Sequence, residues 1–193
     1  MAEIVGYLSW PPRQQTTIIL AMAPRGVVIV AFAGVQSLDV TCPLEVFDGA
    51  NRWLISAARP GPVYRVLVAT RGREPVSTSS GLGLIPHADL DGLRGPVDTL
   101  LVAGGDGRRC GVHDARLVED IRTIARRARR VASVCTGAFL LAEAGLLDGL
   151  RATTHWAWCS ALARDYPQVA VEADPIFVRD GCSQPAQGPA TGG

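Results

Sequence analysis

Three largely apolar runs divide the chain, and the first consists mainly of β-branched residues. They cover residues 27–32, 64–70 and 98–103, and a shorter apolar run follows at 131–134. Continuous runs of this length are typical of parallel strands buried on both faces. Segments with helical spacing lie between them. This alternation predicts an α/β fold with a doubly wound, mostly parallel sheet and helices on both faces.

The intervening segments carry signals for the ends of four helices. Pro43 can open a helix at its first turn, since the missing N–H has no partner there anyway. Asp114 can cap a helix whose apolar face is formed by Leu117, Ile121, Ile124 and Ala128. Two more helices are predicted at residues 139–144, directly after a cysteine, and around residues 160–166.

Several weaker segments complete the predicted organisation. A Ser- and Gly-rich stretch at 76–86 indicates a small hairpin or a meandering loop, and 169–173 and 176–179 indicate two further strands. No internal repeat or internal domain boundary is visible. We expect a flexible extension at 1–24, one domain at 25–181 and a disordered tail at 182–193, where apolar periodicity disappears.

A run of arginines follows the predicted third strand and has two interpretations. It comprises Arg122, Arg126, Arg127, Arg129 and Arg130. Such a run could form a nucleic-acid patch, but cations near a helix C-terminus are also favoured by the helix dipole. We interpret it as a solvated helix face. The net charge of +1 gives no electrostatic case for direct nucleic-acid binding by this chain.

Composition narrows the class of protein. The chain has 193 residues, of which 48% are hydrophobic and 19% charged, as in a single globular domain. Its five cysteines show no CxxC pair and no metal-ligand spacing to histidine, so we expect neither zinc nor another metal or cofactor. The odd number of cysteines fits a reducing cytoplasm. No apolar run approaches the ~20 residues of a membrane span.

The N-terminal region has an ambiguous apolar run at residues 16–23. It ends in Ala-Met-Ala, loosely like a cleavage site, but Glu3 and a Pro-Pro pair precede it and the run is short for a signal core. We therefore expect an extension rather than a leader. A biological start at Met22 is one hypothesis.

Cys135 stands at the point where the apolar run 131–134 gives way to a helix. A cysteine at such a turn lies beside helix N-terminal amides, which stabilise a thiolate, so it could be nucleophilic or oxidisable. The alternative is a small buried cysteine that fills space under the turn. The neighbouring sequence does not decide between these interpretations.

Other polar groups should meet Cys135 at the carboxyl ends of the strands, where open α/β sheets form their sites. Gly104 and Gly105 end one strand and offer backbone N–H groups, either as an oxyanion hole or simply as a tight turn. Asp39 lies between apolar residues and is either a helix cap or a partner of the thiol. His155 is structural or lines the same pocket, with Thr154 and Trp156 beside it.

Taken together, four segments resemble the ThiJ/PfpI superfamily, which has the class I glutamine amidotransferase-like, flavodoxin-like fold. The segments are LDV at 38–40 with PLEVF at 43–47, TLLVAGG at 99–105, VCTGAFLLAEAGLLDG at 134–149 and RATTHW at 151–156. The resemblance extends over about residues 27–181. The segments around Cys135 and His155 are specific, whereas the Gly-Gly pair alone is not.

Within the superfamily, the resemblance is strongest to the N-terminal domain of AraC-type transcription regulators, where a helix-turn-helix domain follows. It therefore implies a ligand-sensing or interaction domain that binds a small molecule near Cys135, with Gly104, Gly105 and His155 lining the site. A second resemblance is to isonitrile hydratases, in which a cysteine, the following threonine and an early aspartate carry the chemistry. Cys135, Thr136 and Asp39 occupy those positions.

The resemblance also leads to expectations about the rest of the molecule. Hydrolase and deglycase members place a glutamate beside the cysteine, and this chain has Asp39 in that region, so neither activity is expected. The family's last strand and long helix are absent after Gly181. We therefore expect a regulator truncated or split from its helix-turn-helix domain, with a helix-turn-helix partner polypeptide and a homodimer to cover exposed apolar surface. A third possibility is a redox sensor that uses Cys135.

Overall fold

The core of the protein is a five-stranded, wholly parallel sheet. The computed structural model describes residues 24–57, 63–106 and 112–180. The strand order is β5-β2-β1-β6-β7, and every neighbouring pair is parallel. The strands are β1 (Arg25–Val30), β2 (Tyr64–Thr70), β5 (Ala88–Asp89), β6 (Val97–Val102) and β7 (Ala128–Ser133). The predicted α/β class and parallel sheet are confirmed.

The apolar runs of the sequence form the centre of this sheet. β1 lies between β2 and β6, and the residues from Val27 to Val30 are at most 3% exposed. Val27 pairs with Val66 on β2 and with Thr99 on β6. A strand that is covered on both faces cannot alternate apolar with polar residues, which explains the continuous run.

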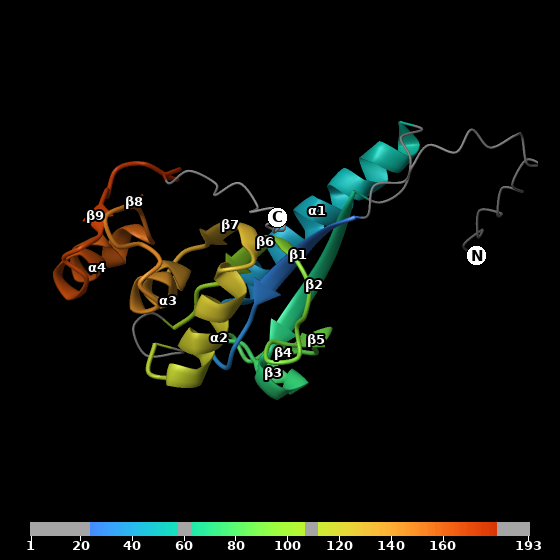
Figure 1. The fold of residues 1–193 in the computed structure, drawn as a ribbon, viewed down its shortest axis with the longest axis horizontal. Helices are drawn as coiled ribbons and strands as arrows, with labels where there is room; N and C mark the ends of the chain where they lie inside the picture. Colours follow the sequence, from blue (N-terminus) through green and yellow to red (C-terminus); the bar gives the residue numbers. More distant parts are fainter. Residues whose placement is uncertain (1–23, 58–62, 107–111, 181–193) are drawn as a thin grey trace, which may run out of the picture.

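Helices cover both faces of the sheet. They are α1 (Ser37–Ser56), α2 (Ala115–Ala125), α3 (Gly137–Glu143) and α4 (Cys159–Asp165). The chain moves from β1 to β2 in one direction along the sheet and from β6 to β7 in the other. Right-handed crossovers therefore place α1 and α2 on opposite faces. α3, α4 and the last strands gather beyond the β7 edge (Figure 1).

Short elements complete the fold. β3 (Val76–Ser77) and β4 (Gly83–Leu84) pair antiparallel, which confirms the predicted small hairpin. β8 (Arg151–Ala152) and β9 (Ala170–Val171) form a separate parallel pair. Two 3₁₀ turns, η1 (Arg71–Arg73) and η3 (Trp156–Trp158), precede β3 and α4 respectively. In the described ranges, no helix has both the length and the apolar character needed to cross a membrane.

The helix expected to open at Pro43 begins six residues earlier. α1 starts at Ser37, so Pro43 lies inside it. Its missing N–H leaves one helical hydrogen bond unmade. The first turn is nevertheless held in place because Asp39 and Val40 are buried, and because Thr41 donates its hydroxyl to the Ser37 carbonyl at 3.0 Å. Tertiary burial here outweighs the local preference of proline.

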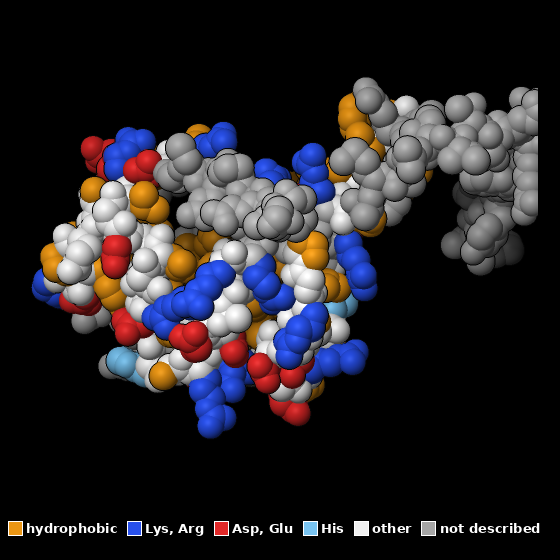
Figure 2. All heavy atoms as spheres, viewed as in Figure 1, with side chains coloured by type: hydrophobic (Ala, Val, Ile, Leu, Met, Phe, Trp, Pro, Cys, Tyr) orange, Lys and Arg blue, Asp and Glu red, His pale blue; other side chains and the backbone are white. Residues whose placement is uncertain are grey.

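The arginine run was wrongly assigned to one helix. α2 ends at Ala125, and Ala128 already pairs with Val97 as the first residue of β7. Arg129 and Arg130 therefore lie on a strand, where both bind the Asp98 carboxylate, with Nε–Oδ1 at 2.7 Å and Nη2–Oδ2 at 3.0 Å. These hydrogen bonds and charges lower the pKa of Asp98 to about 2. Figure 2 shows blue basic side chains mixed with red acidic ones.

Two other predictions for the ends of the chain have different outcomes. The strand expected at 176–179 is wrong: those residues form no strand, and Ile176 and Phe177 are 99% and 79% exposed. They pair with no strand within the described residues. The expectations for residues 1–23 and 181–193, including the apolar run at 16–23 and the tail, lie outside the described residues.

Candidate functional site

Cys135 occupies a sharp turn between β7 and α3, as the sequence predicted. Its φ is 53°, a left-handed conformation that is costly for a residue with a side chain. The turn is fixed on both sides, because Val134 N–H donates to the Val102 carbonyl and Gly137 N–H donates to the Val134 carbonyl, each at 3.0 Å. The backbone therefore holds the sulfur at the carboxyl edge of the sheet.

Two glycines allow the backbone segments around this turn to touch. A Cβ on Gly137 would lie 2.3 Å from the Val102 carbonyl oxygen. A Cβ on Gly104 would lie 2.7 Å from the Thr136 nitrogen and 2.8 Å from Oδ2 of Asp39. No side chain fits at such distances. Gly137 was not among the predicted site residues, although its place after the strand-to-helix turn was a usable signal.

Asp39 reaches the same point from the first turn of α1. Its side chain is buried, and Oδ2 accepts the Gly104 N–H at 3.1 Å. Burial raises the pKa of Asp39 above its usual value. Three smaller effects oppose that rise: the Gly104 N–H, the neighbouring Cys135 side chain, and the charge of His155. Asp39 is therefore a partner of the thiol.

The Cys135 thiol is held in its protonated form. Burial raises its pKa, and the negative charge of Asp39 raises it further. The Thr136 N–H and side chain act in the opposite direction and are outweighed. The helix N-terminus therefore lowers the pKa of Cys135, as expected. Burial and the neighbouring carboxylate raise that pKa by more.

Thr136 and Gly105 are joined by two reciprocal hydrogen bonds. The Gly105 N–H donates to Oγ1 of Thr136 at 2.9 Å, and that hydroxyl donates to the Gly105 carbonyl at 3.1 Å. With the Gly104 N–H bound to Asp39, both glycine amides have acceptors inside the protein. The geometry thus gives Gly104 and Gly105 a positioning role for Asp39 and Thr136.

His155 lies at the exposed side of the site, next to η3. Its Nδ1 accepts the Ala157 N–H at 3.3 Å, and its ring lies 5.4 Å from the Trp156 ring, centre to centre. Trp156 is 79% exposed. The preceding residue connects this loop to the turn, because the Thr154 hydroxyl donates to the Cys135 carbonyl at 2.8 Å. The six predicted site residues and the two neighbours of His155 therefore form one cluster.

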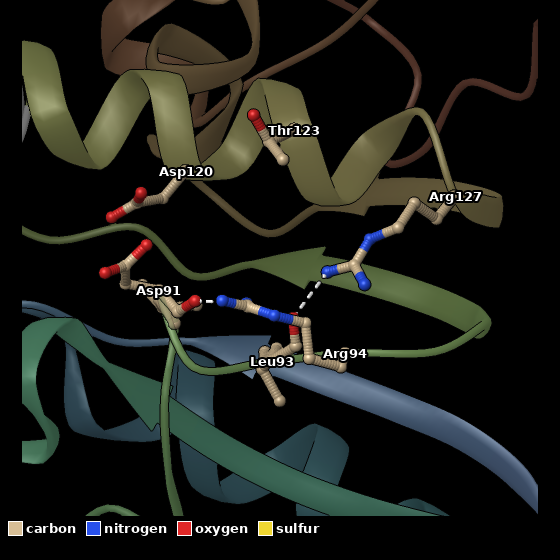
Figure 3. Close-up of a pocket in the computed structure, with 7 residues that line it drawn as sticks. Asp91, Leu93, Arg94, Asp120, Thr123 and Arg127 are labelled. Carbon is tan, nitrogen blue, oxygen red and sulfur yellow. Dashed lines mark hydrogen bonds between the residues drawn. The ribbon is translucent and has the colours of Figure 1, made fainter.

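A separate cavity of about 360 Å³ lies between α2 and the loop that follows β5 (Figure 3). Arg127, just before β7, lines this cavity and donates to the Leu93 carbonyl at 3.1 Å. Arg94 from that loop bonds the Asp91 carbonyl. Cys135 follows the opposite end of β7, so this cavity shares no lining residue with the Cys135 cluster. Among the residues placed in the structure, no group of three or more His, Cys, Asp or Glu could hold a metal ion.

Comparison with known sequences identifies relatives of different functional classes. The protein in the cpoL 5′ region of Streptomyces lividans is 42% identical over 149 residues, which are 77% of this chain and 99% of that protein. Isonitrile hydratase of Pseudomonas putida is 37% identical over 78% of this chain and 59% of its own length. The HTH-type transcriptional regulator CdhR of Pseudomonas aeruginosa is 34% identical over 77% of this chain. The chain spans 41% of CdhR.

Solved structures and a family model agree with the fold described above. A ThiJ/PfpI family protein from Pseudomonas syringae superposes with a TM-score of 0.69 and 25% identity, covering 85% of this chain and 62% of that one. The DJ-1/PfpI family model matches residues 25–192. The relatives of this domain include both an enzyme and transcription regulators. The chain belongs to the DJ-1/PfpI family.

Proposed function

We propose that this chain is the ligand-sensing domain of an AraC-type transcription regulator and binds a small molecule at the Cys135 cluster. The observation that carries this proposal is that the partly buried Cys135 thiol lies in one cluster with the Asp39 carboxylate, and that burial and Asp39 both raise the pKa of Cys135. A site whose cysteine is protonated at neutral pH offers hydrogen-bonding groups to a ligand but lacks an ionised nucleophile. The similarity to CdhR over 77% of the chain supports a regulator role.

Several groups are available to such a ligand. Asp39 offers an acceptor, the Cys135 thiol a weak donor, and the exposed rings of His155 and Trp156 offer apolar contact at the rim. A small polar ligand with a short apolar group matches this set. On this proposal, contact with DNA requires a helix-turn-helix, supplied elsewhere in the regulator or by a partner polypeptide.

A binding screen tests the proposal. Small carboxamides, carboxylic acids, amines and nitriles are each added to the protein, and its melting temperature and the alkylation of Cys135 by iodoacetamide are measured. We expect at least one class to raise the melting temperature and to protect Cys135, and Asp39→Ala to abolish both effects. Failure of every class, or an equal response from Asp39→Ala, would contradict the proposal.

A second candidate is hydration of an isonitrile, favoured by the electrostatic interaction between the Cys135 thiol and the Asp39 carboxylate. Asp39 can take the thiol proton as sulfur attacks the isonitrile carbon, and that proton is then delivered to the same carbon. The resulting thioimidate reacts with water, releasing an N-substituted formamide and restoring the thiol. The similarity to isonitrile hydratase extends over 78% of this chain.

Turnover separates the two candidates. Cyclohexyl isonitrile is incubated with the wild type, Cys135→Ala and Asp39→Asn, and the formamide is measured by chromatography. Formamide produced by the wild type and lost in both variants would establish the enzyme. The sensing proposal predicts that all three proteins give only the uncatalysed background rate.

A further inference from the structure

The cavity between α2 and the loop after β5 carries charged groups that the site described above does not use (Figure 3). Its volume of about 360 Å³ is within the range of small-molecule sites. Asp120, Thr123 and Arg127 come from α2 and the turn after it, at spacings of three and four residues that put them on one face. The loop contributes Asp91 and Arg94 from the other wall. Asp91, Arg94 and Thr123 are exposed, so a ligand can enter from solvent.

The two carboxylates lie together at one end of the cavity. Figure 3 shows the Asp91 and Asp120 side chains directed toward one another from the two walls. Burial raises the pKa of Asp120, Arg71 opposes that rise, and the charges of Asp91 and Asp114 add to it. Arg71 binds Asp120 with Nε–Oδ2 at 3.0 Å and approaches Asp114 with Nη1–Oδ2 at 3.6 Å. One arginine therefore faces three carboxylates, and this end of the cavity attracts a cation.

The two arginines of the cavity converge on a single carbonyl oxygen. Arg94 Nη1 and Arg127 Nη2 donate to the Leu93 carbonyl at 2.9 Å and 3.1 Å. Within the described ranges, neither guanidinium forms an ion pair with a carboxylate, since their hydrogen bonds go to main-chain carbonyls. The Arg127 Nε–H is buried and donates to no acceptor in the described part of the chain. Because a buried donor without an acceptor is costly, this end of the cavity favours an anion.

We propose that this cavity binds an ω-amino carboxylate, a small molecule with a primary ammonium group and a carboxylate at opposite ends of a short aliphatic chain. The carboxylate binds the guanidinium groups of Arg94 and Arg127. The ammonium group donates to Asp91 and Asp120 at the other end. The Leu93 side chain also lines the cavity and supplies an apolar contact for the aliphatic chain between the two charges.

The cavity restricts both the length of the ligand and its cationic group. Asp120 and Arg127 are seven residues apart, about 10 Å along the direction of α2, so the two charges of the ligand must be several ångströms apart. An α-amino acid is too short to reach both ends. The carboxylates and the Thr123 hydroxyl accept from N–H groups, and no aromatic ring is among the described residues that line the cavity. A primary ammonium group is therefore favoured over a quaternary one.

Calorimetric titration of the full chain with matched probes tests the proposal. 6-Aminohexanoate carries both charges, hexanoate and hexylamine carry one each, and glycine carries both without the required spacing. We expect 6-aminohexanoate to bind about tenfold more tightly than hexanoate or hexylamine, and glycine to give no heat of binding. Equal binding of hexanoate, hexylamine and 6-aminohexanoate, binding of glycine, or binding of no probe would overturn the proposal.

Two variants that each remove one charge test where 6-aminohexanoate binds. Asp91→Asn should weaken its binding about tenfold but should not weaken that of hexanoate, because only an ammonium group contacts Asp91. Arg94→Gln should weaken 6-aminohexanoate and hexanoate alike. Arg116→Gln, at an exposed arginine of α2 outside the cavity, is the matched control and should bind like the wild type. Full affinity for 6-aminohexanoate in Asp91→Asn or Arg94→Gln would overturn the proposal.

Alkylation of Cys135 by iodoacetamide separates this cavity from the Cys135 cluster. We expect saturating 6-aminohexanoate to leave the alkylation rate of Cys135 unchanged, because the two sites share no lining residue. Protection of Cys135 would put the ligand at the Cys135 cluster and overturn the proposal. The cavity does not depend on the proposed ligand site at Cys135, so the two proposals can fail separately.

Discussion

The Asp39 carboxylate and the Cys135 thiol lie in one cluster, and each shifts the pKa of the other in the opposite direction. The thiol lowers the pKa of Asp39, whereas Asp39 raises the pKa of Cys135. This interaction favours one arrangement of protons, an ionised carboxylate beside a protonated thiol. Removing the charge of Asp39 should therefore change the reactivity of the Cys135 sulfur more than the stability of the fold.

The alkylation rate of Cys135 should depend on Asp39. In Asp39→Asn the carboxylate charge is lost, so the pKa of Cys135 falls and the thiolate fraction at pH 7 rises, giving about fivefold faster reaction with iodoacetamide. Mass spectrometry of peptides measures the rate, with the exposed Cys42 of the same chain as an internal reference. An unchanged ratio of Cys135 to Cys42 labelling would show that the two groups are not coupled.

Replacing Cys135 by glycine should give a more stable protein than replacing it by alanine. Both variants lack the thiol, but only glycine adopts a φ of 53° without strain. We expect a difference of about 1 kcal/mol in the free energy of unfolding, measured with urea. A Cys135→Ala protein as stable as Cys135→Gly would mean that the turn relaxes when the sulfur is removed.

Asp98 should contribute pH-dependent stability. Its pKa falls from 3.8 to about 2 in the folded protein, so its contribution is present above pH 3.8 and is lost as the pH falls through 2. We expect Asp98→Asn to cost about 1 kcal/mol at pH 6 after allowance for the half-exposed arginines, and much less at pH 2. The exposed Asp174→Asn is the control, with little effect at either pH. If Asp98→Asn lowers the free energy of unfolding by the same amount at both pH values, the charge of Asp98 is not the cause of the loss.

Gly104→Ala should disrupt both the site and the fold. The new Cβ would lie within 2.8 Å of Asp39 and Thr136 atoms, which can move only by breaking the hydrogen bonds around Cys135. We expect a loss of about 2–3 kcal/mol in unfolding free energy. Gly26→Ala is the matched control, because its Cβ would meet only the Pro96 carbonyl at 3.8 Å. Similar stability of the two variants would contradict the close approach.

The buried strands were predictable because burial on both faces leaves a direct mark on the sequence. β2 begins and ends at the predicted residues, and β1 and β6 differ by one or two. β5 has only two residues and leaves no such mark. The start of β7 was hidden because its first residues, including Arg129 and Arg130, are polar and bind Asp98 across the sheet. That partner becomes visible only once β6 and β7 are paired.

The candidate site was predictable as a set of residues, since parallel strands bring their carboxyl ends together. The sequence did not reveal which of these groups bind one another in the folded chain. Gly104 and Gly105 carry N–H groups suited to an anion, yet in the folded chain they bind Asp39 and Thr136. The raised pKa of Cys135 likewise depends first on the burial of its own sulfur and then on the charge of Asp39, and both result from the packing around the site.

The contact between Gly137 and Val102 has a consequence for how this site can be altered. Main-chain atoms of α3 and β6 touch there directly, with no side chain between them. Repacking the surrounding core would therefore leave the sulfur where it is, because no core side chain sets that separation. Attempts to reshape the site for another molecule should instead vary the exposed loop that carries His155 and Trp156, which can change without moving the junction of α3 and β6.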